Sequence, residues 1–300
     1  MRPEPPFGRR AAAMITPFTA GGALDLEGTA RLAVHLVDRG GSDALVLNAT
    51  TGESATTTDA EKDAVLRAVL EAVGDRASVI AGVGTSDTRH TIALARAAAA
   101  AGAHGLLVVT PYYSRPTQEG IVRHLETVAD ATELPVMLYD IPARTGAGTE
   151  LTADSLRRLA GHPRIRAVKD CAYDLLKSGL VMESTDLAYY SGCDELHLPL
   201  YALGATGYVS TVANVAGPQV RAVLDAVDAG DLATATRLHR RLLPLVDTMM
   251  TGVPGTVSVK ALFAAAGMPG GPVRGPLLPA GEELTGRLVE NLKAVLAPAS

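Results

Sequence analysis

The chain has 300 residues, of which 47% are hydrophobic and 20% charged, and its formal net charge is −5. This composition is typical of a globular protein and excludes both a disordered chain and a basic surface for nucleic acid, and the sequence has no run of 18 apolar residues that would predict a membrane span. Its two cysteines, Cys171 and Cys193, form neither a disulfide framework nor a metal-binding spacing, so we expect a reducing, cytoplasmic location.

Short apolar runs alternate with helical segments along most of the chain. Residues 1–10, rich in Pro and Arg, predict a flexible N-terminal extension. Thr58-Asp-Ala-Glu61 has the spacing of a capping box, Ser86 is the expected N-cap of the next helix, and Pro218 suits the first turn of the eighth. The predicted strands are residues 11–18, 44–48, 79–83, 105–110, 135–140, 165–170, 187–191 and 206–213. The predicted helices of this part are residues 26–39, 59–73, 86–102, 118–131, 152–160, 173–183 and 195–203, and an eighth that begins near residue 218.

Eight strand-helix units in a row predict an α/β fold, a TIM (β/α)8 barrel, over residues 11–230. Beyond Gly230 the strand patterns cease. Helices are expected at residues 231–250, 257–266 and 282–296, separated by turns rich in Gly and Pro. We therefore predict that residues 231–300 form a C-terminal helical extension of one catalytic domain.

One lysine stands in an unusual place. The run Ile165-Arg-Ala-Val-Lys169-Asp170 reads as a buried strand, and buried strands seldom carry lysine. Desolvation lowers the pKa of an amine and leaves it free to attack a carbonyl as a Schiff-base nucleophile. The alternative is a structural ion pair with Asp170 or a neighbouring acid.

Polar residues follow several other predicted strands, where a barrel of this kind builds its site. Thr50 and Thr51 precede a glycine in a loop that suits a carboxylate, although a plain turn explains the same residues. One further loop places two rigid phenols at Tyr112 and Tyr113, and another begins at Tyr139. A tyrosine hydroxyl can transfer protons, but packing at the surface is the alternative for each ring.

Arg144 lies five residues after Tyr139 and can hold a carboxylate with two hydrogen bonds, or it can stand on a solvated face. All of these groups fall at one rim of the predicted barrel. Their combination favours Lys169 as the nucleophile for a small keto acid, the tyrosines as a proton relay, and Arg144 as the anchor of a second, anionic substrate.

Six strings at the predicted strand ends belong together: ATTGES (49–54), VTPYYSRP (109–116), LYDIPARTG (138–146), AVKD (167–170), YYSGCD (189–194) and TGYVSTVANV (206–215). By these strings the chain resembles the dihydrodipicolinate synthase family, also called 4-hydroxy-tetrahydrodipicolinate synthases, and is most like its actinobacterial members. This family belongs with the N-acetylneuraminate lyases among the pyruvate-dependent class I aldolases. The resemblance extends over nearly the whole chain.

The resemblance implies a role for each matching residue. Lys169 would condense with the C2 carbonyl of pyruvate, whose carboxylate would sit on Thr50 and Thr51. Tyr139 would transfer protons and would be linked through Thr50 to Tyr113, which reaches in from a neighbouring subunit.

Gly192 and the carbonyl of Val209 would line the pocket, and Arg144 would bind the carboxylate of aspartate β-semialdehyde. The resemblance also implies a homotetramer built as a dimer of dimers, with no metal or organic cofactor. The expected activity is a lyase of lysine and diaminopimelate biosynthesis.

Three departures from the family pattern leave the aldehyde open. Ala49 replaces the usual glycine, Cys193 stands where an acid is common, and residues 252–260 lack an Asn-Pro-x-Pro run. The alternatives are another pyruvate aldolase, acting on a sugar acid or an aldehyde of specialised metabolism, and a catalytically silent paralogue that binds a keto acid.

Overall fold

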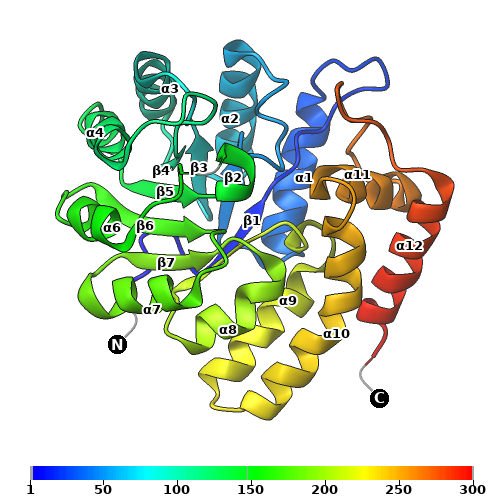
Figure 1. Ribbon diagram of the computed structural model, residues 1–300. Coiled ribbons are helices and arrows are strands. Elements are labelled where there is room, and N and C mark those ends of the chain that lie inside the picture. The colour runs from blue at the N-terminus through cyan, green and yellow to red at the C-terminus, as the bar shows by residue number, and fades with distance from the viewer. Residues whose placement is uncertain (1–2, 147, 299–300) are drawn as a thin grey trace.

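Eight parallel strands close into a barrel in the computed structural model, which describes residues 3–146 and 148–298 (Figure 1). The strands are β1 (Arg10–Ala13), β2 (Ala44–Leu47), β3 (Ser78–Gly82), β4 (Gly105–Val109), β5 (Val136–Asp140), β6 (Ile165–Asp170), β7 (Ala188–Ser191) and β8 (Gly207–Ser210). Each strand pairs with the next along the chain, and β8 pairs back with β1. The predicted TIM (β/α)8 barrel is confirmed.

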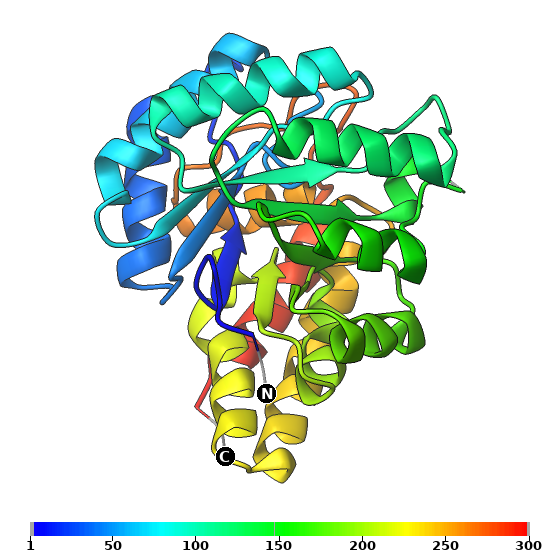
Figure 2. The same ribbon diagram turned by 90° about the vertical axis from the view of Figure 1, so that its left-hand side faces the viewer.

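Helices cover the outside of the barrel (Figures 1 and 2). Thr58 and Glu61 form the predicted capping box of the second helix. The helices are α1 (Leu26–Asp38), α2 (Asp59–Val73), α3 (Thr88–Ala101), α4 (Gln118–Ala129), α5 (Pro142–Thr145), α6 (Ala153–Ala160), α7 (Leu175–Ser184), the 3-10 turn η1 (Asp194–Leu196), α8 (His197–Ala202), α9 (Ala213–Asp228), α10 (Leu232–Met250), α11 (Gly255–Ala266) and α12 (Glu282–Leu296).

The alternation of strand residues divides the core into two layers. Residues such as Val168 pack between the sheet and the helices. Residues such as Ala167 fill the inside of the barrel. Lys169 follows Ala167 by two positions and so faces the inside. Strand register sets it level with Tyr139 of β5 and Tyr190 of β7.

The N-terminal segment differs from the flexible extension that we predicted. Phe7 is buried inside the barrel with the inner layer. A Cβ atom at Gly105 would lie 2.2 Å from its ring, and Tyr190 donates a hydrogen bond to the carbonyl of Gly8 at 2.7 Å. The ring of Phe7 supplies apolar volume that the alanine-rich first strand lacks. The prediction is therefore wrong for this segment, while residues 1 and 2 lie outside the described range.

Three predicted boundaries are also wrong. The first strand ends at Ala13 because the following residues turn away toward the C-terminal part, where Phe18 donates to the carbonyl of Gly270. The eighth strand ends at Ser210, and the last barrel helix already begins at Ala213, with a break in its helical geometry at Ala216. The one-turn helix α5 was not predicted.

The N-cap of α3 is Asp87, not Ser86. The Asp87 carboxylate accepts a hydrogen bond from the backbone of Arg89. A carboxylate is at least as good a cap as a serine hydroxyl, and the sequence offers both in succession. The helix therefore begins one residue later than expected.

The C-terminal helices α10, α11 and α12 form the helical extension and pack beside α9 (Figure 1). Within the described residues, no single helix is both long and apolar enough to span a membrane; α10 and α11, bent by 103°, pass that test only as a pair. The division of the chain into a catalytic domain of residues 11–230 and an extension of residues 231–300 stays a prediction.

Candidate active site

The amine of Lys169 lies inside the barrel near the carboxyl end of β6. Lys169 is only 3% exposed, and its Nζ lies 4.1 Å from the centre of the Tyr139 ring. Burial disfavours the ammonium form and lowers the pKa of Lys169 from its ordinary value of 10.5. Asp170 faces the opposite layer, where it accepts a hydrogen bond from Ser178 of α7 at 2.5 Å. The alternative of an ion pair between neighbouring residues of the strand is therefore not what the structure shows.

Tyr139 is the nearest titratable partner of this amine on β5. It is buried, and burial, followed by the nearby thiol of Cys171, raises the pKa of Tyr139 well above 10.0. A hydrogen bond with Thr50 acts in the opposite direction. The phenol therefore stays protonated at neutral pH and is placed to donate and recover a proton beside Lys169.

The loop after β2 carries the two threonines that we singled out. Thr50 lines a surface cavity of about 590 Å³ together with Tyr139. The hydroxyl of Thr51 is buried and lies 3.2 Å from the hydroxyl of Thr211, which follows β8. Two residues of this loop, Asn48 and Glu53, adopt positive φ angles of 53° and 56°. The loop therefore follows a path that is tight for residues with side chains.

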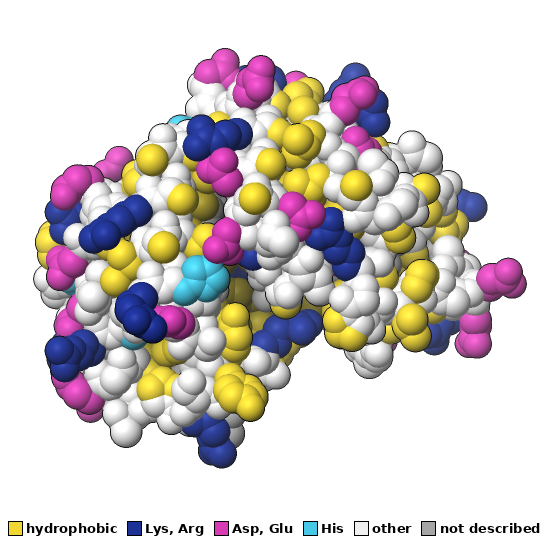
Figure 3. All heavy atoms as spheres, turned by 90° about the horizontal axis from the view of Figure 1, so that it is seen from above, with side chains coloured by type: hydrophobic (Ala, Val, Ile, Leu, Met, Phe, Trp, Pro, Cys, Tyr) yellow, Lys and Arg dark blue, Asp and Glu magenta, His cyan; other side chains and the backbone are white. Residues whose placement is uncertain are grey.

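The cavity opens between the barrel loops and the C-terminal part of the chain. Seen from above, the surface is hollowed near the centre, with charged and histidine side chains along the hollow (Figure 3). Tyr112 and Arg144 line the cavity together with Thr50 and Tyr139. Tyr113 is instead 92% exposed, with a φ of 72°. Within one chain, the structure does not bring Tyr113 to Lys169.

Gly192 and Val209 complete the predicted set. Gly192 donates its N–H to the carbonyl of Asp170 at 2.9 Å, and a Cβ atom at this position would lie 2.9 Å from Cε of Lys169. Only a residue without a side chain fits so close to the amine. Val209 is fully buried in the inner layer of β8. The structure therefore places the Gly192 backbone against Lys169.

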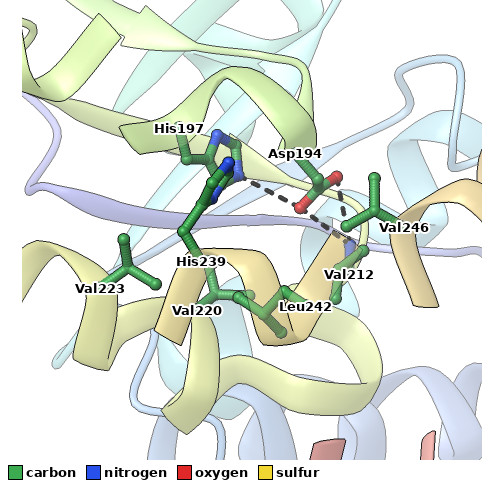
Figure 4. A pocket seen from close by; sticks show the side chains of 8 residues that line it. All are labelled: Asp194, His197, Val212, Val220, Val223, His239, Leu242 and Val246. Atoms are coloured by element: carbon green, nitrogen blue, oxygen red, sulfur yellow. Dashed lines mark hydrogen bonds and ion pairs between the residues drawn. The ribbon is translucent and has the colours of Figure 1, made fainter. Parts of the chain in front are cut away.

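A buried acid that we did not single out lies between β7 and β8. Asp194 accepts hydrogen bonds from the hydroxyl of Ser210, from the backbone N–H of Thr211 at 3.1 Å, and from Nε2 of His197 at 3.1 Å. Figure 4 shows this carboxylate between His197 and Val212, beside a small internal cavity. It fixes the loop that contains Gly192 to the end of β8.

The sequence offered one signal for this acid. Asp194 sits in the string YYSGCD, just after a predicted strand, where a carboxylate is worth considering. Its partners Ser210 and Thr211 come from the next strand, and short-range spacing did not reveal that connection.

Two thiols lie beside the amine. Cys171 and Cys193 are buried and free. A hydrogen bond with Cys171, followed by burial, raises the pKa of Cys193. The thiol of Cys193 therefore stays protonated, and both cysteine side chains pack near Lys169. Among the described residues, no group of three or more His, Cys, Asp and Glu side chains is arranged to hold a metal ion.

Comparisons with known proteins agree on one family. The model of the dihydrodipicolinate synthetase family matches residues 6–295. The chain is 63% identical to 4-hydroxy-tetrahydrodipicolinate synthase 1 of Streptomyces coelicolor over 285 residues, which is 95% of this chain and 92% of that protein.

Solved structures are similar over the same extent. Dihydrodipicolinate synthase of Bacillus anthracis superposes with a TM-score of 0.93 at 38% identity and covers 98% of this chain and 99% of that one. The chloride-inhibited dihydrodipicolinate synthase of Acinetobacter baumannii, complexed with pyruvate, gives a TM-score of 0.89 at 32% identity and covers 96% and 99% of the two chains.

Proposed function

Because the chain belongs to the dihydrodipicolinate synthetase family, we propose that it is a 4-hydroxy-tetrahydrodipicolinate synthase, a lyase that condenses pyruvate with L-aspartate β-semialdehyde. One observation carries the proposal in structural terms. The buried amine of Lys169 lies against the ring of Tyr139, and the Tyr139 hydroxyl is hydrogen bonded to Thr50 at the cavity. A neutral amine and a proton donor are the two groups that imine formation needs.

The reaction then follows from these groups. Lys169 attacks C2 of pyruvate, water leaves with a proton supplied by Tyr139, and an imine forms. The deprotonated Tyr139 takes a proton from C3 to give the enamine, which attacks the aldehyde carbon of the second substrate, and the alkoxide formed takes this proton back from Tyr139. The substrate's own amine then closes the ring and displaces Lys169, which returns to its free form. Burial lowers the pKa of Lys169 and so raises the fraction of neutral, nucleophilic amine at a given pH.

The two carboxylates are proposed to bind at different places. The hydroxyls and N–H groups of Thr50 and Thr51 hold that of pyruvate, with Gly192 and the carbonyl of Val209 along the wall. Arg144, at the exposed side of the cavity, holds that of the aldehyde. This arrangement leaves C3 of the enamine facing the incoming aldehyde.

Tyr113 is proposed to complete the proton relay of a neighbouring subunit in a homotetramer made of two dimers. Its exposed ring and positive φ support this role, since a strained, solvent-facing aromatic gains from burial in a partner. We expect dilution to monomers to abolish turnover while circular dichroism still reports the folded barrel. Full turnover of monomers, measured at concentrations fixed by analytical ultracentrifugation, would contradict the role of Tyr113.

A direct experiment tests the proposed activity. Borohydride reduction in the presence of pyruvate should leave a stable adduct on Lys169, located by mass spectrometry of peptides. Turnover with aspartate semialdehyde is then compared with cleavage of N-acetylneuraminate and 2-keto-3-deoxygluconate. Preference for a sugar acid would favour another aldolase, and an adduct without any turnover would favour a silent keto-acid-binding protein. Absence of the adduct would refute all three.

Replacing Gly192 by alanine tests the crowding around the amine. The added methyl would meet Sγ of Cys171 at 2.4 Å and Cε of Lys169 at 2.9 Å, so one of them must move. Overpacking of this kind costs about 1–3 kcal/mol, and we expect turnover to fall about tenfold or more. The control is Gly286→Ala in α12, where the new methyl would meet no described atom within 4 Å apart from the backbone of its own helix and its chain neighbours. Equal turnover of the two variants would show that the Gly192 backbone does not confine Lys169.

A cytoplasmic location is also proposed. The two buried free thiols support it, because such cysteines are typical of reducing compartments.

A further inference from the structure

A buried ion pair ties the loop of Thr50 and Thr51 to the C-terminal extension. Nζ of Lys260, on α11, lies 2.6 Å from Oε1 of Glu53, and the two side chains are 3% and 1% exposed. The second oxygen of Glu53 accepts the backbone N–H of Arg274 at 2.9 Å. A buried pair of charges is retained only where its geometry is well defined, so the end of this loop is held tightly.

The same part of the extension is anchored on Phe18. Nζ of Lys260 and Cζ of Arg274 each lie 4.1 Å from the centre of the Phe18 ring. The Arg274 guanidinium also donates to both carboxylate oxygens of Glu61, at 2.6 and 2.9 Å, near the start of α2. These contacts fix the extension against Phe18 and against the first turn of α2.

A second connection reaches the loop at Thr51 itself. The hydroxyl of Thr256, near the start of α11, donates to the carbonyl of Thr51 at 2.8 Å, and both residues are buried. Thr16 donates to the carbonyl of Gly52 at 2.7 Å from the other side. The orientation of a peptide group sets where its neighbouring N–H points. The Thr51 carbonyl shares its peptide plane with the N–H of Gly52, so the Thr256 hydroxyl fixes this plane and with it the backbone of Thr51.

We propose that Thr256 and the Lys260–Glu53 pair are positioning residues for the keto-acid carboxylate, so that the helical extension shapes the first half of the reaction. This inference rests on the proposed function. Both connections end on the loop of Thr50 and Thr51, and neither involves Arg144, which is proposed to hold the second substrate. Loss of either connection should therefore impair the step with pyruvate selectively.

The hydroxyl of Thr256 gives the sharper test. Thr256→Val keeps the shape of the side chain and removes only the donor, whereas Thr256→Ser keeps the donor. In a reaction with two successive half-reactions, kcat/KM for each substrate reports its own half. We expect Thr256→Val to lower kcat/KM for pyruvate about tenfold and to change kcat/KM for aspartate semialdehyde less than twofold. Thr256→Ser should restore kcat/KM for pyruvate. The control is Thr285→Val, which removes a threonine hydroxyl from α12.

The outcomes of these measurements decide whether Thr256 is a positioning residue. The positioning role would be overturned if Thr256→Val had the wild-type kcat/KM for pyruvate, or if it lost kcat/KM equally for both substrates. It would also be overturned if Thr256→Ser lost as much kcat/KM for pyruvate as Thr256→Val. If the valine does not fold, Thr256→Ala is measured against Thr256→Ser by the same ratio. Glu53→Gln combined with Lys260→Met removes both charges together, and it should reproduce the selective loss. A wild-type protein that forms no pyruvate adduct would refute the proposed function instead.

Discussion

Replacing Lys169 by methionine is expected to lower turnover by about three orders of magnitude or more and to abolish the borohydride adduct. The substitution removes the nucleophile and leaves an apolar side chain of similar length in the same space. Turnover is measured with pyruvate and aspartate semialdehyde, and the adduct by mass spectrometry. An adduct on another lysine of the variant would show that Lys169 is not the Schiff-base residue.

The same variant should be at least as stable as the wild type at neutral pH. Burial lowers the pKa of Lys169 in the folded chain, so the unfolded chain binds the proton more tightly. This difference costs stability at pH values below the unfolded value of about 10.5, and the cost fades as the pH rises toward it. The stability gain of Lys169→Met, measured by urea unfolding, should therefore be larger at pH 7 than at pH 10. Lys293→Met, at an exposed position of α12, is the control.

The second large effect is expected for Asp194→Asn. The amide keeps the shape of the side chain but loses the charge, and its NH₂ group cannot accept from Ser210 or from the backbone of Thr211. Breaking such a buried pair on one side typically costs about 3–5 kcal/mol of unfolding free energy. Asp225→Asn is the matched control, because its ion pair with Arg221 is exposed and should contribute little.

The loss should depend on pH with a definite sign. Burial alone raises the pKa of Asp194, but the positive charge of His197 and the hydrogen bonds from His197, Ser210 and Thr211 outweigh it and leave the pKa below 3.8. An acid whose pKa is lower in the folded chain than in the unfolded chain stabilises the fold at pH values above its unfolded pKa. This contribution is lost as the pH falls through its folded pKa. The difference in unfolding free energy between the wild type and Asp194→Asn is measured by urea unfolding from pH 7 to pH 3. It should narrow only below about pH 3.8. A constant gap would contradict the role of the charge.

The sequence predicted the barrel and its strand order, because alternation and helical spacing are local patterns, whereas the roles of the residues at its rim stay predictions. The position of Lys169 inside the barrel follows from the same alternation. Strand ends were less predictable. Ser210 and Thr211 end their strand by pairing with Asp194 from another loop, and no local pattern encodes such a contact.

Contacts between distant segments explain the remaining differences. The burial of Phe7 depends on the small side chains of β1 and on Gly105, almost a hundred residues away. The ion pair between Glu53 and Lys260 joins residues separated by most of the chain. Both features arise from the closure of the ring and from the return of the extension. A prediction based on windows of ten to twenty residues does not reach them.

The ring of Phe7 has a consequence for how molecules move through the enzyme. It fills the amino end of the barrel, so a molecule that reacts with Lys169 must arrive from the loops at the carboxyl ends of the strands. Incoming keto acid, expelled water, aldehyde and cyclic product then share one route. A first substrate anchored deep in the barrel leaves the outer part free for the second, and the order of arrival follows from the architecture.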